Sequence, residues 1–248
     1  MDNHIFPKNK KSQPNKEDYT FFKQYNNLCK ITQDGLIIKY PNMLHPLPPL
    51  PVIIAQDISL NDFEYIGFQN TRENDNLEAK QKTVGFFRHD HKFEHLCYQP
   101  YGFIDKLRQY KQIMSPDLSC FTDMPISNQY HNIFLSRLIG AYWQNCGLRV
   151  LPTITWSTEE SFSFCFSGIE QGAVVAVSTI GTGSNKWKFM AGFERLCCAL
   201  KPSCVICYCN PYPEMHKHTK IIKVEHEANK ALRFAKQRQI PGQLSFKI

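Results

Sequence analysis

The sequence predicts an α/β fold in which mostly parallel strands alternate with helices. We expect an irregular or incomplete (β/α) barrel, with an open, mostly parallel α/β sheet as the alternative. The stretch Gly172 to Leu200 has the pattern of a buried strand, a glycine loop and a helix, and weaker copies of this pattern precede it. The chain has 248 residues, of which 42% are hydrophobic, so it can bury a full core.

The clearest strand–helix unit supports a central, parallel strand. Ala173 to Thr179 is an unbroken run of apolar and β-branched residues, which is typical of a strand covered on both faces. After the glycine loop, apolar residues recur at helical spacing from Trp187 to Leu200. The helix is therefore expected to pack one face on the sheet.

The predicted order begins with a disordered basic tail over residues 1–18, which has too little apolar content to fold. Residues 19–248 are expected to form a single α/β domain. It would start with a short helix from Tyr19 to Lys30 and a short strand from Gly35 to Tyr40. The proline cluster Pro41 to Pro51 must be extended.

Regular βα units are expected over about residues 83–210. The long helix of about residues 128–146 should end at Gly147, and Ser157 is expected to cap a helix that has Glu160 in capping-box position. A basic helix over about residues 224–237 should close the chain. The expected strands are Val52–Asp57, Phe63–Gln69, Thr83–His89, Gln112–Ser115, Leu148–Thr155, Ala173–Thr179 and Cys204–Cys209.

Composition limits the function classes. The formal charge of +7 and the pI near 8.8 favour an acidic partner, nucleic acid included, although much of the excess charge lies in the tails. No apolar segment is long enough to span a bilayer, and the N-terminus lacks the apolar core of a signal peptide. We therefore expect a cytoplasmic protein whose ten cysteines are mostly free thiols.

In a parallel α/β fold, functional side chains lie at the carboxyl ends of the strands. Asp90 and Asp117 follow neighbouring predicted strands, where they could act as acid and base or bind a divalent cation. An aspartate in this position is also a common turn or cap residue. The candidate ligand-binding residues are Ser119, Arg137, Trp156, Ser178, Gly181, Thr182, Gly183, Ser184 and Lys186.

The glycine loop from Gly181 to Ser184 would present free backbone N–H groups at a helix N-terminus, with Lys186 nearby. This arrangement suits a phosphate or carboxylate, but a plain structural turn uses the same glycines. Arg137 could pair with one of the acids or with a ligand phosphate, or lie solvated on the helix surface.

Two patterns could bind zinc. His91, Glu94 and His95 match the H-x-x-E-H pattern of inverted zinc peptidases, which requires two imidazoles on one helix face. The cysteines of the strand Cys204 to Cys209, together with His216 and His218, are the second candidate, although a hydrophobic strand explains the cysteines more simply. Zinc hydrolysis is therefore a remote alternative, and no residue is assigned as a metal ligand.

Several motifs resemble a protein family of unknown function found in phages, mobile elements and low-GC Gram-positive bacteria. They are SPDLSCFTDMP from Ser115, LSRLIGAYWQNCGLRVLPTITWSTEESFSFCFSGI from Leu135 and VAVSTIG from Val175. The resemblance covers about residues 83–210 and implies a bacterial cell or a phage-infected host, with no assigned activity. Such proteins tend to carry an acidic pair where this chain has His89-Asp90-His91, and an acidic residue where it has Ser167.

The leading hypothesis is a domain that binds an anionic small molecule or nucleotide at the rim of the strands. Hydrolysis with Asp117 as acid, base or metal ligand is the candidate chemistry. The alternative is a nucleic-acid- or protein-binding accessory factor that uses the basic tails. The sequence leaves the substrate and the oligomeric state open.

Overall fold

The computed structural model describes residues 29–31, 37–39 and 50–227. The expected tail over 1–18, most of the helix expected from Tyr19 to Lys30, most of the proline cluster and most of the helix expected over 224–237 lie outside these residues. Within them the fold is mixed α/β, and the predicted strand–helix alternation is confirmed.

Most of the strands are parallel and follow chain order. The first sheet has the order β3-β4-β5-β6 and the second the order β7-β8-β9, while β1 and β2 form a separate antiparallel pair. The strands are β1 (Cys29–Ile31), β2 (Ile37–Lys39), β3 (Tyr65–Gly67), β4 (Thr83–Gly85), β5 (Gln112–Met114), β6 (Val150–Leu151), β7 (Val174–Ser178), β8 (Cys204–Tyr208) and β9 (Ile221–Val224).

Thr153, just after β6, forms a parallel bridge with Ala176 of β7 and so joins the two sheets. Within residues 50–227, no backbone ladder pairs β9 with β3, so a closed barrel is not confirmed. The observed architecture is two parallel sheets in a mixed α/β domain.

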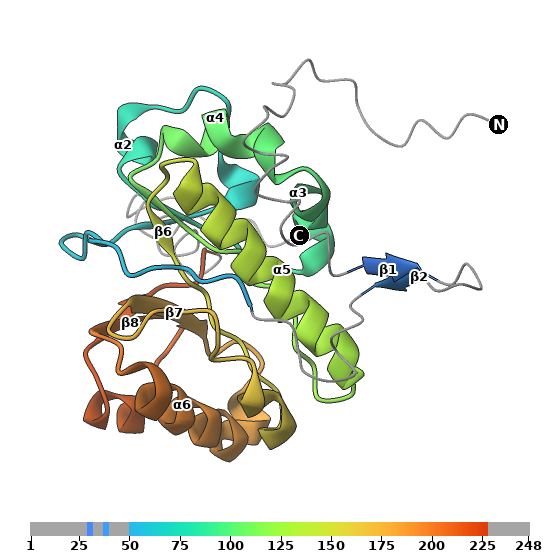
Figure 1. Cartoon of the computed structure of the whole chain (residues 1–248). Helices are drawn as coiled ribbons and strands as arrows, with labels where there is room; N and C mark the ends of the chain where they lie inside the picture. The colour runs from blue at the N-terminus through green and yellow to red at the C-terminus, as the bar shows by residue number, and fades with distance from the viewer. Residues whose placement is uncertain (1–28, 32–36, 40–49, 228–248) are drawn as a thin grey trace, which may run out of the picture.

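The helices cover the sheets. They are α2 (Leu77–Lys80), α3 (Glu94–Tyr98), α4 (Ile104–Arg108), α5 (Ile126–Asn145) and α6 (Lys186–Leu200). In Figure 1, α6 lies against β7 and β8, while α5 packs beside β6. As predicted, α5 ends just before Gly147, which has a φ of 83° that glycine adopts without strain.

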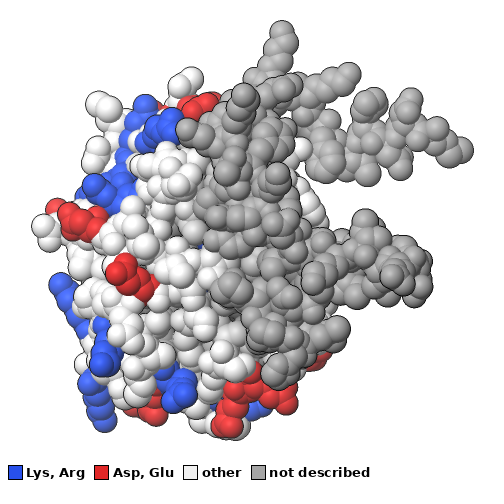
Figure 2. Space-filling view, viewed as in Figure 1, with Lys and Arg blue, Asp and Glu red and all other residues white. Residues whose placement is uncertain are grey.

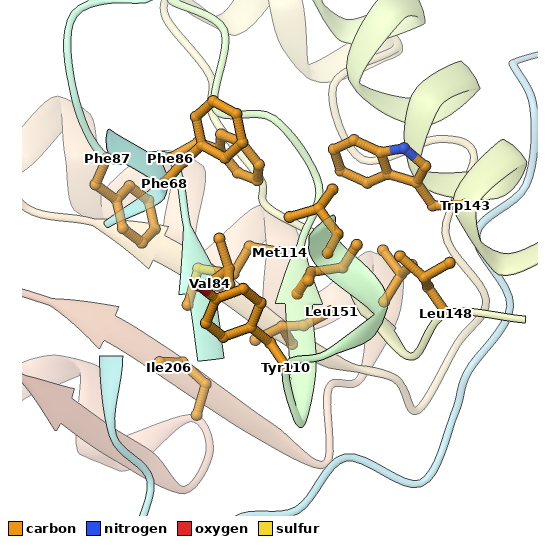
Figure 3. Close-up of a cluster of buried hydrophobic side chains, with 14 of the residues drawn as sticks. Phe68, Val84, Phe86, Phe87, Tyr110, Met114, Trp143, Leu148, Leu151 and Ile206 are labelled. Carbon is orange, nitrogen blue, oxygen red and sulfur yellow. The ribbon is translucent and has the colours of Figure 1, made fainter. Parts of the chain in front are cut away.

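Alternate residues of β7 and β8 face two different cores, which explains their unbroken apolar sequences. Val175 and Val205 belong to the cluster that packs on α6, whereas Ala176 and Ile206 belong to the cluster shared with β4, β5 and α5. Ile206 belongs to the same buried cluster as Val84, Met114 and Leu151 of the other sheet, and Figure 3 labels all four. Both faces of the second sheet are therefore buried.

Four local expectations are corrected. The strand expected over Val52–Asp57 does not form, because only Ile53 pairs there, in an isolated parallel bridge with Ile169. Ile221–Val224 forms the additional parallel strand β9, so Val224 does not begin a helix and Cys204–Tyr208 is not the last strand. Ser157 does not cap the following helical turn, because its hydroxyl contacts the Gln129 side chain and Thr158 precedes the turn. Lys30 lies in β1 instead of a helix.

Candidate functional site

The carboxyl ends of β4 and β5 are held together by Asp90 and Ser119. Asp90 opens the short 3-10 helix η3 (Asp90–Lys92), five residues after β4 ends. Its carboxylate accepts hydrogen bonds from the Ser119 backbone amide at 3.0 Å and from the Ser119 hydroxyl at 2.9 Å. Both donors follow β5, so this contact fixes the loops after two neighbouring parallel strands.

Asp117 lies in the same place but has no comparable partner. Its side chain is partly exposed, and no hydrogen bond or ion pair engages its carboxyl group within residues 50–227. Burial, together with the negative charge of Asp90, raises the pKa of Asp117 to about 8. The group is therefore largely protonated at neutral pH, in contrast to an ordinary surface aspartate.

Three aromatic rings pack on one another across the two sheets. Tyr65 of β3 packs on Tyr208 of β8 with their ring centroids 4.9 Å apart, and Phe87 stacks on Tyr208 at 4.8 Å. These rings come from both sheets, so they bring β3, the segment after β4 and β8 together. Burial raises the pKa of the Tyr65 hydroxyl well above its ordinary value, and the charges of Tyr208, Glu227 and Asp117 raise it further.

Glu227, which the sequence reasoning missed, ties the end of the described chain to β3. Its carboxylate accepts hydrogen bonds from the Gly67 amide and from the side-chain amides of Gln69 and Asn70, each at 2.8 Å. It also forms an ion pair with Arg88 at 3.1 Å. A glutamate just past a short strand carries no sequence signal of this role, because all its partners are more than a hundred residues away.

Arg137, a candidate ligand-binding residue, lies in the interior of the protein. It is fully buried, and its guanidinium donates to the backbone carbonyls of Ser167 at 3.1 Å, Thr153 at 2.9 Å and Cys165 at 2.8 Å. Burial lowers its pKa to about 10. Arg137 therefore fastens α5 to the segments after β6, and neither candidate acid is among its contacts.

Trp156 and Ser178 also make structural contacts. Trp156 packs on Phe189 of α6 at 4.9 Å between ring centroids, directly over Gly192. A Cβ atom at Gly192 would lie 2.1 Å from the Trp156 indole nitrogen, so glycine is needed there. The Ser178 hydroxyl accepts a hydrogen bond from the Ile180 amide at 3.1 Å and so shapes the turn after β7.

The glycine loop forms a separate surface. Thr182 bonds Tyr212 through their hydroxyls at 2.7 Å, and Lys186 pairs with Glu214 at 2.6 Å. An open hollow at this loop is lined by Gly183, Ser184, Lys186, Trp187, Met190, Glu194 and Glu214, a set without Asp90 or Asp117. The structure thus brings Asp90, Asp117 and Ser119 together and leaves Gly181, Thr182, Gly183, Ser184 and Lys186 at another place.

The two zinc patterns find little support in the geometry. His91 belongs to η3, and α3 begins only at Glu94, so His91 and His95 do not share one helix face. The His95 ring packs on Phe103 at 5.3 Å. Across residues 50–227 no cluster of three metal-ligating side chains is present. A divalent cation between Asp90 and Asp117 would therefore need further oxygen ligands from water or substrate.

The cysteines of β8 serve the core. Cys204 and Cys207 are fully buried and belong to different hydrophobic clusters on the two sides of the sheet. The cysteines whose side chains the structure describes are free thiols, as predicted.

Comparison with known protein families assigns the fold to a family. The family described as "Domain of unknown function (DUF4417)" matches residues 47–226. The chain belongs to this family. The DUF4417 match begins before β3 and contains both sheets, Asp90, Asp117 and Ser119, and it ends one residue before Glu227.

Two curated relatives come from phages, and together with the family match they confirm the predicted resemblance to a phage family of unknown function. The chain is 34% identical to the "Gene 1 protein" of Mycobacterium phage L5 over 158 residues, which cover 61% of this chain and 69% of that protein. It is 37% identical to the "Gene 1 protein" of Mycobacterium phage D29 over 129 residues, which cover 51% of this chain and 48% of that protein. No solved structure matches the chain.

None of the helices in the described part of the chain is both long enough and apolar enough to span a membrane.

Proposed function

We propose that this DUF4417 domain binds an anionic small molecule, such as a nucleotide, at the carboxyl ends of β4 and β5. The observation that carries the proposal is Asp117, an acid with a raised pKa and no polar partner within residues 50–227. Acidic side chains with strongly raised pKa values cluster at functional sites, because elsewhere in proteins such side chains are paired with a polar partner or exposed to solvent. A protonated carboxyl group can donate a hydrogen bond to an anionic oxygen without charge repulsion.

The candidate chemistry is hydrolysis with Asp117 as the proton donor. A carboxyl group whose pKa lies near 8 holds its proton at neutral pH and can transfer it to the leaving oxygen of a bound ligand. Asp90 keeps its carboxylate oriented by both Ser119 donors, and its negative charge helps Asp117 to retain the proton. The two aspartates would then have different roles because their surroundings differ.

A thermal-shift series tests this proposal. The full chain is screened with adenosine and guanosine mono-, di- and triphosphates at pH 6.5 and pH 9.0, in the presence and absence of Mg²⁺. The titratable groups that face Asp117 are Asp90, Tyr65 and Cys120, so the same pH pair is applied to an Asp117→Asn variant. Wild type should be stabilised by a nucleotide at pH 6.5 and lose the shift at pH 9.0.

Three variants test whether a neutral group at position 117 is needed for nucleotide binding. Asp117→Asn keeps a neutral donor and should retain the shift at both pH values, whereas Asp117→Ala should lose it. Asp123→Asn, at an exposed aspartate outside the site, should behave as wild type. Equal shifts in wild type and Asp117→Ala would contradict the proposal.

The second candidate function is a nucleic-acid- or protein-binding accessory factor, which rests on the formal charge of +7. On the face in Figure 2, the described basic and acidic side chains lie in small separate groups with uncharged residues between them. The basic ends of the chain, residues 1–18 and the residues after Glu227, would then carry the binding. DNA or RNA affinity that falls steeply with salt and disappears on deletion of the tails would support this function.

A further inference from the structure

Four hydrogen-bond donors converge on the carboxylate of Glu227. Its Oε1 atom accepts from the Gly67 backbone amide and from the Asn70 side-chain amide, each at 2.8 Å. Its Oε2 atom accepts from the Gln69 side-chain amide at 2.8 Å and from the Arg88 guanidinium at 3.1 Å. Each carboxylate oxygen therefore has two donors, and we call the four residues that supply them the oxyanion cradle.

The two segments that carry the cradle are fixed by the hydrophobic core. The short 3-10 helix η2 (Phe68–Asn70) directly follows β3, and the Thr71 hydroxyl donates to the Phe68 carbonyl oxygen at 2.6 Å. The Phe68 ring is buried and stacks on the Phe86 ring with 5.1 Å between centroids. Phe86 lies two residues before Arg88, so this contact also holds the segment after β4. Donors held in this way need little rearrangement to bind an anion.

The cradle faces solvent, and its occupant comes from outside the family domain. Gln69, Asn70 and Arg88 are exposed. Within the described part of the chain, the donor groups of these three side chains make no hydrogen bond or ion pair other than those to Glu227. The DUF4417 match over residues 47–226 contains the whole cradle and ends before Glu227. The domain thus supplies the donors, and a residue after its end supplies the acceptor.

We propose that the oxyanion cradle binds a carboxylate or phosphoryl group of a ligand, and that Glu227 fills the cradle until the ligand displaces it. The strands β3 and β4 are parallel, so the cradle lies at their carboxyl ends, where Asp90 also follows β4. An arginine and N–H donors that engage two oxygens suit both anions. The inference rests on the proposed function only for the identity of the ligand.

Glu227 acts in this proposal as an autoinhibitory contact. A ligand that needs the empty cradle binds more weakly by the fraction of molecules in which the cradle is empty. Removal of the Glu227 carboxylate should therefore raise the affinity for small anions, although the same change weakens the fold.

Calorimetric titrations of wild type and Glu227→Ala with inorganic phosphate and with acetate, at pH 7, test the proposal. Glu227→Ala should bind at least one of the two anions about tenfold or more tightly than wild type does. Phosphate binding would assign a ligand with a phosphoryl group, and binding of acetate alone would assign a carboxylate. Equal affinities in the two proteins, or binding of neither anion by Glu227→Ala, would overturn the proposal.

A second substitution locates the bound anion. Arg88→Met in the Glu227→Ala protein should weaken anion binding by about tenfold or more, the loss expected for a hydrogen bond between charged groups. Arg108→Met in the same protein is the matched control, because Arg108 is exposed and pairs with Asp105 outside the cradle. Its affinity should not change. Anion binding that survives Arg88→Met, or that both substitutions weaken alike, would contradict the cradle.

The wild-type protein gives a test that needs no substitution. In 15N-labelled full-length chain, added phosphate or acetate should shift the Gly67 amide and the side-chain amides of Gln69 and Asn70 together, relative to sodium chloride at equal ionic strength. The Gln109 side-chain amide, which donates to backbone carbonyls elsewhere, should stay in place. Cradle resonances that move with neither anion would overturn the proposal. Nucleotide shifts independent of Asp117 would instead overturn the proposed function and leave an Arg88-dependent cradle standing.

Discussion

Asp90 and Ser119 form a two-point contact in which one carboxylate accepts both the backbone amide and the hydroxyl of one serine, at 3.0 and 2.9 Å. The contact joins the loops after β4 and β5 and keeps the Asp90 charge near Asp117. It therefore sets both the shape and the electrostatics of the candidate site.

Ser119→Ala should lower the free energy of unfolding by about 1–2 kcal/mol, because the hydroxyl donor to a charged acceptor is lost while the amide donor remains. Urea unfolding at pH 7 measures this change. Ser127→Ala, at an exposed serine, is the control and should change little. An unchanged stability in Ser119→Ala would show that the contact does not hold the loops.

Asp117 should make stability depend on pH in a defined direction. Its pKa of about 8 in the folded protein exceeds the ordinary value of 3.8, so between these values the folded state holds a proton that the unfolded chain has released. The stabilising contribution is full below pH about 4 and is lost as the pH rises through about 8. The slope has an upper limit of about 1.4 kcal/mol per pH unit, and the partial exposure of Asp117 reduces it.

Urea unfolding of wild type and Asp117→Asn from pH 4 to pH 9 isolates this contribution. The free energy of unfolding of wild type, relative to that of Asp117→Asn, should fall as the pH rises. The Asp123→Asn variant should follow wild type. Parallel pH profiles for wild type and Asp117→Asn would argue against a raised pKa.

Glu227→Gln should destabilise the domain by about 1–3 kcal/mol. The substitution removes the ion pair with Arg88 and weakens acceptance from the Gly67 amide, and the Glu227 side chain is only 17% exposed. Urea unfolding gives the magnitude. Glu159→Gln changes an exposed glutamate and should have little effect. If both variants unfold alike, Glu227 does not tie the chain end to β3.

Arg137→Met should destabilise by about 3 kcal/mol or more, because three backbone carbonyls lose a charged donor in the buried interior. Arg137→Lys should recover only part of this loss, since an ammonium group cannot reach carbonyls in a fork geometry. Arg149→Met, at an exposed arginine, provides the control. Denaturant unfolding of the three proteins decides the matter, and a stable Arg137→Met protein would contradict the structural role.

Sequence patterns predicted the elements whose signal is local. The apolar run before Gly181 identified β7, and helical spacing identified α6 and α5. The strand β9 was missed because its four residues follow a 3-10 turn and precede polar sequence, so neither length nor alternation marks it. Pairing with β8, a long-range interaction, decides its conformation.

The candidate site was predicted in part for the same reason. Asp90, Asp117 and Ser119 were found because the carboxyl ends of neighbouring parallel strands must lie together. Tyr65 resembled any other apolar strand residue, and its packing depends on the space at Gly85 of another strand. Among the described contacts none joins the glycine loop to these acids, and Lys186 pairs with Glu214.

The protonation of Asp117 at neutral pH is the central claim, and an NMR titration tests it most directly. The carboxyl carbon of Asp117 is observed in protein labelled with 13C-aspartate, and the Asp117→Asn variant assigns its resonance. We expect the Asp117 carboxyl group to titrate with a midpoint near pH 8. A midpoint near the ordinary value of about 4 would contradict it.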